Sequence, residues 1–142
     1  MENLILIGEI EGLFNTDATA KKYVRDAKFI LVSIDNVTYK MIMHLECYPY
    51  KYHAQAVLKY MEDNNLNEIY SYGGAKIVLS TIDDILCHGK SYALNTANDE
   101  KLAEVVKSIW PNVKLEIMTS GVKVKEAVLF SKEQIKYFAE HP

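Results

Sequence analysis

Two neighbouring segments in the first third of the chain have the pattern of a β-hairpin. Residues 28–35 form a run rich in β-branched and aromatic side chains, and residues 36–45 alternate, with apolar side chains at Val37, Tyr39, Met41 and Met43. Asn36 lies between the two runs as a turn residue. The pattern predicts two antiparallel strands joined by a tight turn.

Two other segments have the spacing of amphipathic helices. Apolar side chains recur at helical spacing in residues 52–62 and again in residues 98–110. Asn98 is expected to cap the second helix, and Pro111 to end it. A short final helix is expected after Ser131, because Ser131 and Gln134 match a capping box.

The remaining segments predict short strands. Residues 68–72, 75–80 and 85–89 are expected as strands, with a turn at the glycine pair Gly73-Gly74 and a hairpin around Asp83-Asp84 in residues 81–84. Residues 113–117 alternate as a strand, and residues 122–130 are expected as another. Near the start, residues 4–10 are expected as a strand followed by a loop.

The order of these elements predicts an α+β fold of one domain over residues 1–142. It runs strand pair, helix, three strands, helix and strand, with extensions at both ends. Two helices are enough to cover both faces of one mixed sheet, and the order is not the regular alternation of a doubly wound fold. A length of 142 residues fits a single domain.

Composition narrows the class of protein. The net charge of −3 argues against a broad nucleic-acid surface. Only two cysteines occur, far apart, which predicts a reducing compartment without a disulfide framework. The first residues lack the pattern of a signal peptide, and no apolar run has membrane-spanning length. We therefore expect a cytoplasmic protein with no membrane partner.

His53 is the first candidate for chemistry. It lies in the first turn of the predicted helix, on the flank of the apolar face, where it is expected to be partly reachable. The helix dipole disfavours a positive charge there, so a neutral ring that accepts a proton is expected. The alternative is a structural histidine bonded to a backbone carbonyl.

The second candidate is an anion-binding loop in residues 88–99. Gly89 permits a sharp turn, Ser91 offers a hydroxyl, and successive loop amides can form an anion-binding concavity. Lys76 and Lys28 are candidate point charges for a phosphate. The alternatives are an ordinary strand-to-helix connection and two solvated lysines.

Neither a metal site nor a cofactor site is predicted. His44 and Cys47 have a ligand-pair spacing, but no second pair of that form exists. Cys87 and His88 are adjacent in a predicted strand, so their side chains point to opposite faces.

Taken in order, the motifs resemble those of the Janus/phosphohistidine phosphatase family. They are Tyr52-His53-Ala54 opening a helix, Gly73-Gly74-Ala75-Lys76-Ile77 entering a strand, Gly89-Lys90-Ser91-Tyr92-Ala93 before a helix, and Trp110-Pro111 ending it. The likeness covers about residues 28–117. The extensions 1–27 and 118–142 lie outside it.

The resemblance implies a mixed sheet of about six strands with one helix on each face. It also implies metal-independent removal of phosphate from a phosphohistidine-containing protein or peptide, without a cofactor. His53 corresponds to the base that activates water, Ser91, Tyr92 and Ala93 to the phosphate-holding loop, and Lys76 and Lys28 to its cations.

The chain departs from the family pattern at several positions. Lys76 stands where arginine is usual, Ala75 replaces a third glycine, Tyr92 replaces an expected methionine, and an expected arginine upstream of Tyr52 has no counterpart. These departures leave open a module that binds phosphate or a phosphopeptide without hydrolysing it. A structural interaction domain, with a homodimer formed through the C-terminal extension, is a third alternative.

Overall fold

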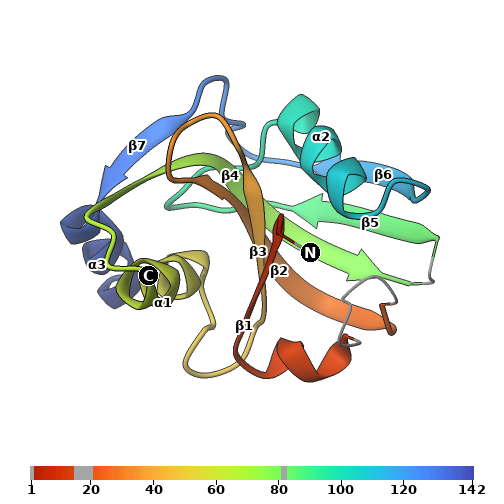
Figure 1. Cartoon of the computed structure of the whole chain (residues 1–142), viewed down its shortest axis with the longest axis horizontal. Helices are drawn as coiled ribbons and strands as arrows, with labels where there is room; N and C mark the ends of the chain where they lie inside the picture. The colour runs from red at the N-terminus through yellow and green to blue at the C-terminus, as the bar shows by residue number, and fades with distance from the viewer. Residues whose placement is uncertain (1, 15–20, 81–82) are drawn as a thin grey trace.

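The computed structural model describes residues 2–14, 21–80 and 83–142, and in these residues one mixed sheet carries all the strands (Figure 1). The strand order is β1-β3-β2-β4-β5-β6, and β7 pairs with β4 outside this path. The β1–β3 and β5–β6 pairs are parallel and the others antiparallel. The strands are β1 (Leu4–Ile7), β2 (Val24–Ser33), β3 (Lys40–Leu45), β4 (Glu68–Leu79), β5 (Asp84–Gly89), β6 (Lys114–Thr119) and β7 (Val128–Ser131). The predicted α+β class is confirmed.

Helices cover both faces of this sheet. One face is covered by α2 (Asp99–Ile109) together with the 3-10 helix η1 (Gly8–Leu13). The other face is covered by α1 (His53–Asp63) and α3 (Lys132–Glu140), which lie side by side (Figure 1). The resemblance implied one helix on each face; the final helix expected after Ser131 is α3, and the structure places it beside α1. Burial of two apolar clusters, one under each helical layer, is the main stabilising contribution to the fold.

The local signals at the strand pair and the helix starts predicted these elements correctly. β2 and β3 form the expected antiparallel pair, but the turn at Asn36 is not tight: the strands end at Ser33 and resume at Lys40, so residues 34–39, including Val37, form a longer connection. The Asn98 side chain accepts a hydrogen bond from the Lys101 amide, and Ser131 and Gln134 form the reciprocal capping box that opens α3. The expected hairpin of β4 and β5 is also present, although residues 81 and 82 lie outside the described residues.

The prediction of a turn at Gly73-Gly74 is wrong. β4 runs unbroken through both glycines. Gly73 has a φ of +89°, and a Cβ there would lie 2.6 Å from the Thr96 carbonyl oxygen. The loop after β5 lies directly on the strand, with hydrogen bonds of 3.0 Å from the Gly74 amide to Asn95 and from the Ala97 amide to Gly74. The two glycines allow the backbone of the loop after β5 to approach β4 closely, and they do not reverse the chain.

The two ends of the chain also differ from the prediction. The first strand ends at Ile7 and η1 follows it, where a longer strand and a loop were expected; residues 15–20 lie outside the described part. Of the strand expected over 122–130, only residues 128–130 are in a strand, as the start of β7 (Val128–Ser131). Ile135 and Ala139 of α3 are buried against the α1 layer, so the C-terminal extension covers the sheet as part of the domain. A homodimer through this extension stays a prediction.

In the described ranges of the chain, no helix is long and apolar enough to cross a bilayer.

Candidate functional site

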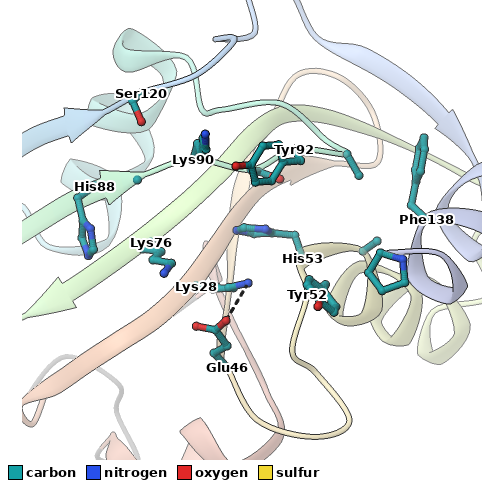
Figure 2. A pocket seen from close by; sticks show the side chains of 15 residues that line it. Lys28, Glu46, Tyr52, His53, Lys76, His88, Lys90, Tyr92, Ser120 and Phe138 are labelled. Carbon is teal, nitrogen blue, oxygen red and sulfur yellow. Dashed lines mark ion pairs between the residues drawn. The ribbon is translucent and has the colours of Figure 1, made fainter.

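A cavity of about 460 Å³ opens on the face of the sheet that α1 and α3 cover (Figure 2). Its floor and sides come from β2, β4, β5, the start of α1, the loop after β5, and the end of the chain. The residues lining it are Lys28, Glu46, Tyr52, His53, Ala54, Lys76, His88, Gly89, Lys90, Ser91, Tyr92, Ala93, Ser120, Phe138 and Pro142. All six site residues predicted from the sequence therefore border one cavity.

His53 is held more deeply than the sequence predicted. Its side chain is only 6% exposed, not partly reachable on a helix flank. Its Nε2 lies 2.9 Å from the Ala75 carbonyl oxygen, which requires the ring proton on Nε2 and leaves the lone pair on Nδ1. No hydrogen bond joins Nδ1 to another residue in the described part of the chain. Nδ1 is therefore the atom that can accept a proton.

The neutral state of His53 has a different cause from the one expected. The pKa of His53 falls from 6.5 to about 3, chiefly because the ring is buried; the bond to Ala75 opposes this shift, and the nearby His44, Lys28 and Lys76 add to it. The sequence attributed neutrality to the helix dipole. Desolvation has the larger effect, because the ring packs against the sheet rather than standing at the helix rim.

Gly74 creates the space for this ring. A Cβ on Gly74 would meet the Phe29 carbonyl oxygen and would lie 2.9 Å from Cδ2 of His53. Real Cβ atoms do not approach other atoms so closely, so both the Phe29 backbone and the His53 ring restrict this position to glycine.

Two lysines lie next to each other on the cavity floor. Lys28 on β2 and Lys76 on β4 are cross-strand partners, so their side chains share one face of the sheet. Lys28 is 7% exposed, its Nζ lies 3.5 Å from Glu46, and it also lies 5.1 Å from the centre of the Tyr52 ring. Burial lowers the pKa of Lys28, while Glu46 raises it. The pair gives the cavity a cationic floor.

The loop that begins at Gly89 forms the opposite wall. Gly89 has a φ of +73°, which turns the chain out of β5. Ser91 is buried and its amide lies 3.4 Å from Thr96 Oγ1, whereas the amides of Tyr92 and Ala93 make no backbone hydrogen bond within the described residues. Tyr92 is 80% exposed, and the Lys90 ammonium lies 4.5 Å from its ring centre. Within the described residues, the backbone of the fold therefore does not use the amides of Tyr92 and Ala93.

The sequence reasoning missed two histidines that belong to this arrangement. In the sheet register His44 pairs with Lys28, Lys28 with Lys76, and Lys76 with His88. These four residues make a row across four strands on one face, which we call the basic row. Alternation along each strand places a side chain on a face, but only the register between strands, which is not local, brings the four together.

The ring of His44 packs against the ring of His53. His44 is fully buried, its Nδ1 lies 2.7 Å from the Tyr50 carbonyl oxygen, and its ring meets that of His53 edge to face with centroids 5.9 Å apart. Burial lowers the pKa of His44 to about 4. It lies beneath the cavity rather than in its lining.

The C-terminal extension adds an apolar wall that the sequence reasoning also missed. Phe138 of α3 and Pro142 line the cavity, and Figure 2 shows Phe138 at the end away from His88. The Phe138 ring packs edge to face on Phe130 of β7, at 6.2 Å between centroids. The extension therefore belongs to the site as well as to the fold.

Neither comparison with known proteins nor the placement of possible metal ligands assigns a family or a metal to this site. No protein-family model and no curated protein matches the chain. Among the described residues, no group of three or more histidine, cysteine, aspartate or glutamate side chains is placed to hold a metal ion.

Proposed function

We propose that this protein is a metal-independent phosphatase that hydrolyses the phosphorus–nitrogen bond of phosphohistidine in a protein or peptide. One observation carries the proposal. A single cavity brings together a neutral buried imidazole, two neighbouring lysines and the amides of a loop, which come from α1, β2, β4 and the segment after β5. Each group suits one part of phosphoryl transfer.

The phosphoryl oxygens would be held by the lysine pair and by the amides of Tyr92 and Ala93. Phosphoryl transfer depends mainly on positioning and on neutralising charge, so such a site needs little covalent chemistry of its own. The Ser91 hydroxyl supplies a further hydrogen-bond donor in the same wall. The leaving group departs as imidazole, which needs no metal to stabilise it.

His53 would act through Nδ1 by one of two routes. As a general base it would take a proton from the attacking water, a contribution worth roughly a hundred- to ten-thousand-fold. As a nucleophile it would bond to phosphorus and be phosphorylated transiently. A pKa of about 3 makes the ring a weak base in the empty site, and a phosphoryl dianion beside it raises that pKa. Trapping a labelled phosphoryl group on His53 would distinguish the nucleophilic route.

A binding module that does not hydrolyse phosphate is the second candidate. The observation that favours it is the burial of His53, whose side chain is 6% exposed. A histidine bonded to a backbone carbonyl and shielded from solvent also fits a purely structural role. Such a module would bind a phosphohistidine peptide and release no phosphate.

The test is phosphate release from a phosphohistidine peptide with a chelator present. The wild-type protein should turn over, and His53→Gln should lose at least a hundred-fold in rate while remaining folded by circular dichroism. His141→Gln is a matched control, because His141 is exposed and lies outside the cavity lining. Binding without release by the wild type would support the module instead, and full activity in His53→Gln would refute the role of His53.

A further inference from the structure

His88 differs from the other two histidines near the cavity in how its ring is held. His44 and His53 each place a ring nitrogen within hydrogen-bond distance of a backbone carbonyl. His88 makes no such bond in the described residues. Its Nε2 is enclosed without a partner, as is Nε2 of His44, but of the two only His88 lines the cavity. Buried polar atoms are nearly always bonded, so an imidazole in a cavity wall with no partner is available to a ligand.

His88 also lies next to the lysines on the cavity floor. It is the cross-strand partner of Lys76, at the end of the basic row, one strand beyond β4. His53 lies instead against Gly74 on β4 itself. Figure 2 shows Lys76 between the two imidazoles, with His88 and Ser120 at one end of the cavity and Phe138 at the other.

This arrangement fits the geometry of in-line displacement. The attacking and leaving groups must lie on opposite sides of the phosphorus atom. A phosphoryl group held over Lys28 and Lys76 has His53 on one side, and its leaving group extends toward the His88 end of the cavity. We propose that His88 donates the proton that lets the leaving imidazole depart neutral, a role that rests on the proposed phosphatase function.

In the proposed hydrolysis a water oxygen bonds to phosphorus, and His53 Nδ1 takes a proton from that water. The phosphorus–nitrogen bond breaks, and its electron pair stays on the nitrogen. His88, as imidazolium, gives its proton to the other ring nitrogen of the substrate, so that neutral imidazole leaves. His53 then releases its proton to solvent, and His88 takes one up.

The charged side chains around His88 are mostly basic. Lys76 on β4, Lys28 on β2 and Lys90 in its own loop line the same cavity, as does Glu46, the partner of Lys28. On β6 the register partner of His88 is the uncharged Met118, and Glu116 lies on the same face two residues earlier. A bound phosphoryl dianion offsets the lysine charges, so that end of the cavity is suited to a proton donor when substrate is bound.

The experiment compares two phosphohistidine peptides of identical sequence, one of them methylated on the ring nitrogen distal to phosphorus. The methylated ring leaves as a neutral imidazole without a proton, so it does not need His88. We expect His88→Gln and His88→Asn to slow cleavage of the unmethylated peptide about a hundred-fold and of the methylated peptide less than about three-fold. His141→Gln should behave as wild type on both.

The outcomes separate the role of His88 from the function itself. Equal losses on the two peptides, or full activity of both variants on the unmethylated one, would overturn the role of His88 and leave the phosphatase function standing. A wild-type protein that cleaves neither peptide would overturn both. A loss confined to the unmethylated peptide is not produced by a structural defect, because a distorted cavity slows both reactions.

Discussion

The imidazole of His53 occupies the space that a side chain on Gly74 would need. A Cβ at Gly74 would lie 2.9 Å from His53 Cδ2 and would also meet the Phe29 carbonyl oxygen. The strand and the first turn of α1 are thereby fixed to each other, and the ring that we propose as the reacting group is fixed with them.

Gly74→Ala should therefore destabilise the fold. Overpacking against a backbone oxygen and a ring commonly costs 1–3 kcal/mol, and we expect a loss of about 2 kcal/mol or more in the free energy of unfolding. Gly12→Ala is the matched control, because nothing lies within 4 Å of a Cβ at that position. Urea unfolding measures both, and equal stability of the two variants would contradict the packing described here.

Lys76→Gln should weaken binding of inorganic phosphate about ten-fold, because one of the two cations on the cavity floor is lost. Calorimetric titration measures the affinity. Lys59→Gln removes the same charge from an exposed side chain of α1 that pairs with Asp63, and it should leave the affinity unchanged. Equal weakening in both variants would mean that overall charge rather than this site binds the anion.

The two buried histidines should make the protein less stable in acid. Their pKa values in the folded state, about 3 for His53 and about 4 for His44, lie below the unfolded value of 6.5. The unfolded chain therefore binds more protons below pH 6.5, and stability is full above that pH and falls as the pH drops toward 4. Each histidine should remove about 2 kcal/mol between pH 7.5 and pH 5.

Urea unfolding at pH 7.5 and pH 5 tests this dependence. The difference between the two pH values should shrink by about half in His53→Gln and should stay at the wild-type size in His141→Gln. An unchanged difference in His53→Gln would contradict the buried, neutral state of the ring.

Cutting the chain after Met118 should destabilise the domain, because it removes β7 and α3 and exposes the apolar face of α1 that Ile135 and Ala139 cover. Thermal unfolding measures the loss. Light scattering of the full chain tests the homodimer predicted through this extension, and a monomeric mass at high concentration would contradict it.

Local signals made the fold largely predictable from the sequence. Period-two alternation predicted the β2–β3 hairpin, and Asn98 and the Ser131 capping box marked two helix starts. The glycine pair misled because glycine serves both turns and close backbone contacts, and the contact at Gly73 is with Thr96, far away in the sequence. Such a partner leaves no local signal.

Only the site residues that belong to short sequence motifs could be predicted from the sequence. His53, Lys76 and Ser91 stand in short ordered motifs, whereas His44 and His88 join them through strand register alone. The burial of His53 also depends on its packing against Gly74 and beside His44, which helical spacing within residues 52–62 does not encode.

A crystal structure with phosphate bound tests the proposed phosphate site most directly. The anion should lie over Lys28 and Lys76, bonded to the amides of Tyr92 and Ala93, with His53 Nδ1 facing it. Phosphate bound elsewhere, or a fully occupied anion in this cavity with the His53 ring sealed away from it, would rule out the proposed site.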